Sequence, residues 1–84
     1  MKKSIMLILL EDRKGSAVEV QKALTEMGCF IKTRIGLHDG SPDECTNTGL
    51  IILELMGDQK SKNDLYDCLK AIPHVNVQLV ELSI

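Results

Sequence analysis

The sequence has few aromatic residues, no excess of positive charge and no long hydrophobic run. Only Phe30 and Tyr66 are aromatic among the 84 residues, so the chain offers no stacking platform for single-stranded bases. The formal net charge is −2, from ten basic against twelve acidic side chains, which is far from the balance of nucleic-acid-binding proteins. We therefore expect no direct binding to nucleic acid.

The longest apolar run, Ile5–Leu10, is too short to cross a membrane. Charged residues begin at Glu11 and end the run, whereas a membrane span needs roughly 18 or more apolar residues. The run follows Met1-Lys2-Lys3, but no small-residue cleavage site comes after it, so we do not interpret it as a signal peptide. These features predict a cytoplasmic protein with no membrane partner.

The chain has three cysteines and no CxxC pair. An odd number of widely spaced cysteines does not suggest a disulfide framework, so reduced thiols are expected. The cysteines are Cys29, Cys45 and Cys68.

The first half of the chain predicts a strand followed by a helix. Lys3–Leu10 is apolar at both alternating sets of positions, which is typical of a central strand buried on both faces. Ala17–Met27 has apolar residues at helical spacing. Ser16 and Glu19 form an S-x-x-E capping box at the start of this helix, and Gly28 is placed to end it.

Two further strands are predicted around a turn-rich segment. The first runs from about Ile31 to Leu37 and has one polar face, and the second, Gly49–Met56, is apolar on both faces except at Glu54. The residues predicted to share one face of the first of these strands are Ile31, Thr33, Ile35 and Leu37. The segment His38–Thr48 between them is rich in turn residues and predicts a long connection.

The last part predicts a second helix and a final strand. Asp58 or Ser61 can cap this helix, and Pro73 ends it. Its apolar stripe is formed by Leu65, Leu69 and Ile72. Val75–Leu82 alternates as a strand does.

The resulting order, βαββαβ, predicts an α+β fold of the ferredoxin-like type in one domain, residues 1–84. Such a fold has a four-stranded antiparallel sheet with two helices on one face. The first and third predicted strands are nevertheless apolar on both faces, so the open face of the sheet needs a cover. A second copy of the chain would supply it, and we expect a homodimer or homotetramer formed through the sheet.

The strand-to-helix junction Glu11–Ser16 is the first candidate site. The N–H groups at the start of a helix, beside a glycine that permits close approach, can hold a small anion. We interpret four residues of the junction as candidate ligand-binding residues, with the charge of Arg13 assisting the N–H groups. They are Asp12, Arg13, Gly15 and Ser16. A capped turn without a ligand is the alternative, since capping alone explains Ser16.

The turn-rich segment offers a second candidate, a nickel or zinc site. His38 and Cys45 are suitable ligands, and neighbouring carboxylates add to them, although further ligands would have to come from a partner chain. The carboxylates are those of Asp39, Asp43 and Glu44. A solvated loop is the alternative. Nucleophilic catalysis would need a rigid nucleophile, base and orienting group, which this loop does not supply, so neither an enzymatic activity nor a cofactor is expected.

Two charged residues in the predicted sheet have more than one explanation. Arg34 is either a solvated charge that protects an edge strand or an intersubunit contact to Glu54. Glu54 stands alone among apolar neighbours and needs a partner if it is buried.

The stretch Leu10–Val20 resembles the first strand, turn and helix of ACT-like regulatory domains, which typically have an acidic-Asp-Arg-x-Gly turn before an amphipathic helix. Lys14 stands where many ACT domains have proline. The whole chain is similar to the small stand-alone iron-only hydrogenase system regulators. The matching pieces are Glu11-Asp12-Arg13, Arg34-Ile35-Gly36, Gly49–Leu55 and Leu69–Val77.

This resemblance implies a non-enzymatic regulatory protein of the ACT-like fold. It also implies that a small effector, such as an amino acid, binds at a subunit interface beside the junction residues named above. Two alternatives stay open. One is a metal-responsive protein that uses His38 and Cys45, and the other is a structural module that docks on an enzyme or repressor.

Overall fold

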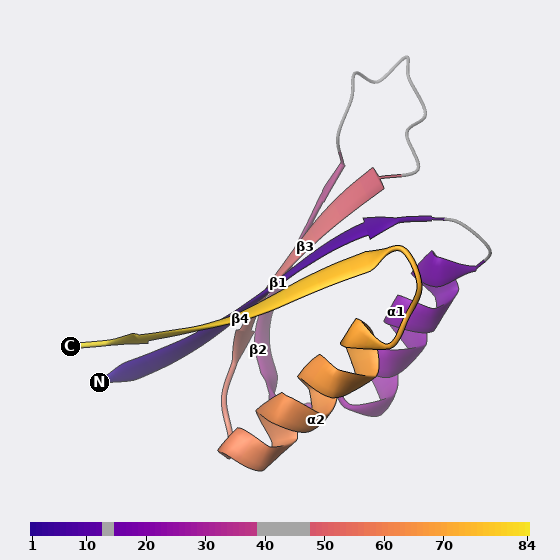
Figure 1. The fold of residues 1–84 in the computed structure, drawn as a ribbon. Coiled ribbons are helices and arrows are strands. Elements are labelled where there is room, and N and C mark those ends of the chain that lie inside the picture. Colours follow the sequence, from indigo (N-terminus) through magenta and orange to yellow (C-terminus); the bar gives the residue numbers. More distant parts are fainter. Residues whose placement is uncertain (13–14, 39–47) are drawn as a thin grey trace.

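Four strands and two α-helices alternate along the described part of the chain, residues 1–12, 15–38 and 48–84 of the computed structural model (Figure 1). The elements are β1 (Lys2–Glu11), α1 (Ser16–Glu26), a short 3-10 helix η1 (Gly28–Phe30), β2 (Ile31–His38), β3 (Thr48–Leu55), α2 (Gln59–Lys70) and β4 (Val75–Ser83). The predicted order βαββαβ is therefore confirmed.

The strands form one antiparallel sheet in the order β2-β3-β1-β4. Met6 of β1 lies opposite Leu53 of β3 on one side and opposite Leu79 of β4 on the other. Both helices lie on the same face of the sheet (Figure 1). The first and third predicted strands are thus neighbours at the centre of the sheet, and the fold is ferredoxin-like.

The core lies between this face and the helices. Met6 and Ile8 of β1 are completely buried there, together with the helical side chains of Val20 and Leu65. The remaining core residues are Leu10, Ala23, Leu24, Ile51, Leu53, Leu55, Leu69 and Val77. Because side chains alternate along a strand, the second apolar set of β1, which includes Leu7, points to the open face, on the side of the sheet opposite α1 and α2.

The alternation in β2 differs from the prediction at one end. The register shifts between Ile31, which lies opposite Leu55, and Thr33, which lies opposite Glu54. Such a β-bulge places two residues of one strand against one of its partner, so the residues on either side of it change face. Ile31 therefore packs against the core, whereas Ile35 is on the open face and is 48% exposed. The prediction that Ile31 and Ile35 share a face was wrong.

Helix α1 begins without the predicted capping box. Gly15 is the N-cap, with a φ of 84°, and Ser16 is already helical and buried. The Ser16 hydroxyl donates a hydrogen bond of 2.8 Å to the carbonyl oxygen of Pro73. The Asp12 carboxylate caps the helix instead, because its Oδ1 accepts a 3.1 Å hydrogen bond from the Ala17 N–H.

Helix α2 has Asp58 as its N-cap, one of the two residues predicted to cap it. Asp58 Oδ1 accepts a hydrogen bond of 2.7 Å from the Ser61 N–H. This bond is the largest of the influences that lower the pKa of Asp58 below 3.8. The contribution of this cap to stability is therefore complete above pH 3.8 and is lost as the pH falls through the lowered value.

The turn between α2 and β4 contains a residue in the left-handed conformation, His74, with a φ of 64°. The carbonyl oxygen of His74 accepts a hydrogen bond of 3.0 Å from the Glu11 N–H, which holds the turn against the end of β1. For a residue with a Cβ this conformation costs roughly 1–2 kcal/mol, and glycine avoids that cost.

We expect His74→Gly to raise the free energy of unfolding by up to about 1 kcal/mol, because the relief of strain exceeds the extra chain entropy of glycine. Urea denaturation followed by circular dichroism measures the change. His74→Ala retains a Cβ and serves as the control, with no stabilisation expected. A glycine variant less stable than the alanine variant would contradict the prediction.

Candidate functional site

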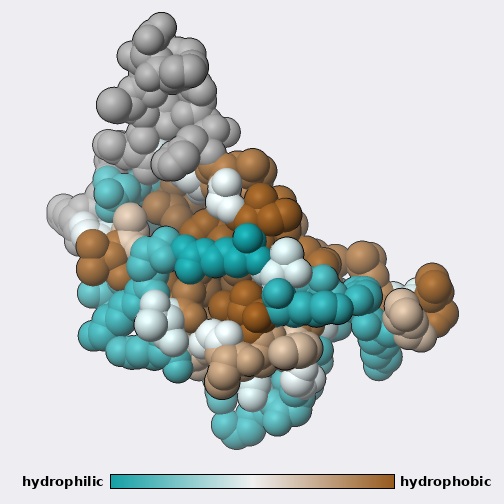
Figure 2. Space-filling model, turned by 180° about the vertical axis from the view of Figure 1, so that it is seen from behind, coloured by the Kyte–Doolittle hydropathy of each residue, from teal (hydrophilic) through white to brown (hydrophobic). Residues whose placement is uncertain are grey.

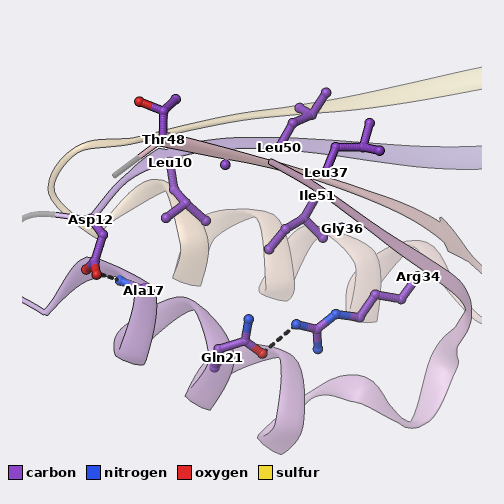
Figure 3. A pocket seen from close by; sticks show the side chains of 11 residues that line it. Leu10, Asp12, Ala17, Gln21, Arg34, Gly36, Leu37, Thr48, Leu50 and Ile51 are labelled. Atoms are coloured by element: carbon purple, nitrogen blue, oxygen red, sulfur yellow. Dashed lines mark hydrogen bonds between the residues drawn. The ribbon is translucent and has the colours of Figure 1, made fainter. Parts of the chain in front are cut away.

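A pocket lies between α1 and the strands β2 and β3, beside the junction of β1 with α1 (Figure 3). Its volume is about 330 Å³, at the lower end of the range of roughly 300–1,000 Å³ for small-molecule sites. The residues that line it are Leu10, Asp12, Ala17, Gln21, Arg34, Gly36, Leu37, Thr48, Gly49, Leu50 and Ile51.

The pocket lies beside the part of β2 that has no apolar side chain directed to α1, beyond Ile31. The positions of β2 that face α1 are Arg34 and Gly36. A Cβ built on Gly36 would meet no other atom within 4 Å, so the space in front of this glycine is open. Figure 3 shows Leu10 and Ile51 pointing from the sheet toward α1, where they form the apolar part of the pocket.

Side chains of opposite charge lie at the two ends of the pocket (Figure 3). At one end Asp12 caps α1 through a single carboxylate oxygen. At the other end Arg34 Nη2 donates a hydrogen bond to Gln21 Oε1. A guanidinium has five N–H donors and a carboxylate has two oxygens, so these bonds leave both groups capacity for a ligand.

The structure distributes the predicted junction residues between different roles. Asp12 lines the pocket, whereas Ser16 points to Pro73 and does not line it. Gly15 forms the left-handed N-cap, and its carbonyl oxygen accepts a hydrogen bond of 3.1 Å from the Glu19 N–H. The Ala17 N–H, expected to hold an anion, is bonded to Asp12. Arg13 lies outside the described residues.

The sequence interpretation missed the other half of the pocket. Gln21 was not considered, and Arg34 was considered only as an edge charge or as a partner of Glu54, which lies on the opposite face of the sheet. The available signal was the pair of glycines, Gly36 and Gly49. A glycine within a strand often marks the close approach of another group.

Neither a metal site nor a membrane-spanning helix is found in the residues that the structure describes. Among them, no group of three or more His, Cys, Asp or Glu side chains could hold a metal ion. His38 ends β2, while the remaining proposed metal ligands, Asp39, Asp43, Glu44 and Cys45, lie outside the described residues. No helix in the described ranges is long and apolar enough to span a membrane.

The open face of the sheet forms a second candidate surface. The strand register places six apolar side chains in two adjacent rows across β2, β3 and β1. We call this set the open-face patch: Leu37, Leu50 and Leu9 in one row, and Ile35, Ile52 and Leu7 in the other. Leu9, Ile35 and Leu37 are each close to half exposed. Figure 2 shows hydrophobic residues gathered at the surface above a band of hydrophilic side chains.

An ion-pair cluster borders the open-face patch. Glu54 Oε2 lies 2.9 Å from Lys3 Nζ and 3.9 Å from Lys32 Nζ. The hydrogen bond from Lys3 is the main cause of the lowered pKa of Glu54, and the same bond raises the pKa of Lys3. Glu54 thus has its partners within the chain.

No protein-family model matches the chain, and no curated protein sequence matches it. Among solved structures, it is similar to an uncharacterized protein from Thermotoga maritima at 27% identity, with a TM-score of 0.83 over 99% of this chain and 100% of that one. It is also similar to the ACT domain of GTP pyrophosphokinase from Chlorobium tepidum, at 17% identity and a TM-score of 0.67 over 95% and 97%.

A third similar structure is a PII-like nitrogen regulatory protein from Thiomonas intermedia K12, bound to ADP, AMP and bicarbonate. Its identity is 15% and its TM-score 0.62, over 100% of this chain and 93% of that one. At these identities the ACT and PII-like proteins show a shared fold. The ACT-like fold that the junction suggested is thereby confirmed.

The buried hydroxyl of Ser16 leads to a prediction about stability. We expect Ser16→Ala to lower the free energy of unfolding by about 1 kcal/mol, because the bond to Pro73 is lost. Thr25→Ala removes an exposed hydroxyl from the same helix and should change stability by less than about 0.5 kcal/mol. Urea denaturation of both variants and of the wild-type protein tests this. If Ser16→Ala is as stable as Thr25→Ala, the hydrogen bond to Pro73 contributes nothing to stability.

Proposed function

We propose that this chain, as a single domain of residues 1–84, is a non-enzymatic cytoplasmic regulator that binds a small zwitterionic effector, such as an amino acid, in the pocket beside α1. The observation that carries the proposal is the placement of Asp12 and Arg34 at opposite ends of a partly apolar pocket. An amino acid has the complementary arrangement, with an ammonium and a carboxylate group on either side of one carbon atom.

The chemistry of the pocket assigns each part of such a ligand. The Arg34 guanidinium binds the carboxylate through paired N–H donors, the strongest geometry for this group. The free carboxylate oxygen of Asp12 accepts hydrogen bonds from the ammonium. An apolar side chain of the ligand packs on Leu10 and Ile51. Each of these groups binds or orients the effector, and none is assigned a reaction.

The solved structures to which the chain is similar support a regulatory role. One similar structure is a domain of a larger enzyme, GTP pyrophosphokinase, and another is a nitrogen regulatory protein that holds small ligands. The resemblance to iron-only hydrogenase system regulators supports the finer proposal that the regulated process is that hydrogenase system. Its matching piece Arg34-Ile35-Gly36 contributes two residues to the pocket.

We further propose that two copies of the chain associate through the open-face patch. A domain of this length gains only roughly 3–5 kcal/mol from its own core, so burial of the patch adds substantially to its stability. Leu37 and Leu50 are among the residues that line the pocket, and both belong to the open-face patch. Effector and second copy therefore contact the same two strands from opposite faces.

The ligand proposal is tested by a thermal-shift screen with the common amino acids. We expect at least one to raise the melting temperature of the wild-type protein. Asp12→Asn keeps an oxygen that can cap α1 but removes the charge, so the ligand-induced shift should be lost with little change in the unliganded melting temperature. Gly36→Val fills the pocket from a position with free space and should abolish the shift as well.

Asp64→Asn is the matched control, because it removes an exposed carboxylate from α2 and should leave the shift unchanged. If no amino acid stabilises the wild type, or if the shift survives in both pocket variants, the pocket is not the effector site.

The association proposal is tested by light scattering. Leu37→Lys places a charge within the open-face patch, outside the core, and should at least halve the mass of the assembly while the fold is retained. Val18→Lys makes the same kind of change at a side chain of α1 that is 69% exposed, and should leave the mass unaltered. A monomeric wild type, or an unchanged mass for Leu37→Lys, argues against association through this face.

A further inference from the structure

We propose that Gln21 of α1 and Arg34 of β2 form one carboxylate-binding unit, in which Gln21 makes the pocket selective for a carboxylate over an uncharged group of the same shape. The inference rests on the proposed function, since it concerns the same pocket. Figure 3 shows the two side chains meeting, one from the helix and one from the sheet. Gln21 thereby gains a role in recognition although it carries no charge.

The hydrogen bond between the two side chains fixes which way the amide of Gln21 faces. Arg34 has only N–H donors, so the atom of Gln21 that it contacts must be the amide oxygen. The amide nitrogen is then directed elsewhere, and Figure 3 shows it pointing toward the sheet. Among the described residues, no acceptor is bonded to this nitrogen. Gln21 therefore presents N–H donors to the pocket beside those of Arg34.

The same hydrogen bond orders the side chain of Arg34. This residue lies on the outer strand β2 and is exposed. A long exposed arginine has many rotamers, and ordering it when a ligand binds costs free energy. The bond to Gln21 holds it across the pocket in advance. A single bond occupies one edge of the planar guanidinium and leaves the other edge for paired bonds to a carboxylate.

The neutrality of Gln21 keeps the positive charge of Arg34 unopposed. Within the described ranges, Arg34 forms no ion pair with a carboxylate, and Asp12 lies at the other end of the pocket. Gln21→Glu would orient the guanidinium in the same way but would cancel its charge. The amide orients without neutralising, so a ligand carboxylate is the partner that Arg34 favours. Space for it exists beside Gly36, where a Cβ would meet no other atom within 4 Å.

The donors of this unit reject a carboxamide. A carboxamide has the shape of a carboxylate, but it has no charge and offers one oxygen and one NH2 group. Bound in the same place, it would direct that NH2 group at the N–H donors of Gln21 or Arg34. A site built to bond one group discriminates strongly against an analogue that leaves its polar groups unpaired. Carboxylate and carboxamide therefore differ in affinity because of Gln21 as well as Arg34.

The unit is tested apart from the rest of the pocket with isocaproate, which is leucine without its ammonium group, and with its amide, isocaproamide. Titrations are followed by the NMR signals of the Arg34 Nε–H and of the backbone N–H groups of Gly36 and Gly49. The wild-type protein should bind isocaproate at least about tenfold more tightly than isocaproamide. Gln21→Met should lower the affinity for isocaproate about tenfold, and Gln21→Glu should abolish the preference.

Both Gln21 variants should fold, because the side chain is exposed. Gln59→Met is the matched control: it changes an exposed glutamine of α2 that is bonded to Asn63, and it should leave both affinities unchanged. Failure of the wild type to prefer isocaproate, including failure to bind it, would overturn the inference, as would an unchanged preference in both Gln21 variants.

The outcome also separates this inference from the proposed effector. If the preference depends on Gln21 but no amino acid stabilises the protein, the carboxylate-binding unit is confirmed and the amino-acid effector is wrong. If an amino acid stabilises the wild type and both Gln21 variants equally, the effector proposal holds and the role of Gln21 is wrong.

Discussion

The alternation of side chains along β1 is the constraint on which the other features depend. This strand lies between β3 and β4 and is apolar on both faces. Met6 and Ile8 point to the helices and are completely buried, while Leu7 and Leu9 point to the open face. Because α1 and α2 both lie on one face, the described residues form a complete core on that side of the sheet and an incomplete one on the other.

The pocket arises because α1 and α2 do not fill all of the space over their face of the sheet. In the described part of the chain, α1 and α2 cover the helical face, and β2 presents a charge and a glycine to α1 instead of two apolar side chains. Arg34 spans the remaining space and bonds to Gln21. A gap in packing thus coincides with the ends of two charged side chains, and such a combination suits a small polar ligand better than a structural role.

The sequence could predict what local periodicity determines. The strands, the helices and the Asp58 cap follow from patterns within a few residues, and all are present. Structural features that depend on contacts between residues far apart in the sequence could not be predicted. The bulge near Lys32 depends on pairing with β3, and Ser16 lies within the helix with its hydroxyl bonded to Pro73, 57 residues away. Half of the pocket was missed for the same reason, since Gln21 and Arg34 meet only in the folded chain.

The position of β1 between two strands that are distant in the sequence bears on how fast the domain folds. β1 precedes both of its neighbours in the sheet, β3 and β4, and is separated from each of them by many residues. Contacts between such distant segments form slowly. Until these contacts form, the most apolar strand is unpaired, and an unpaired apolar strand is prone to aggregation. Loss of β4 would leave that strand without one of its two neighbours in the sheet.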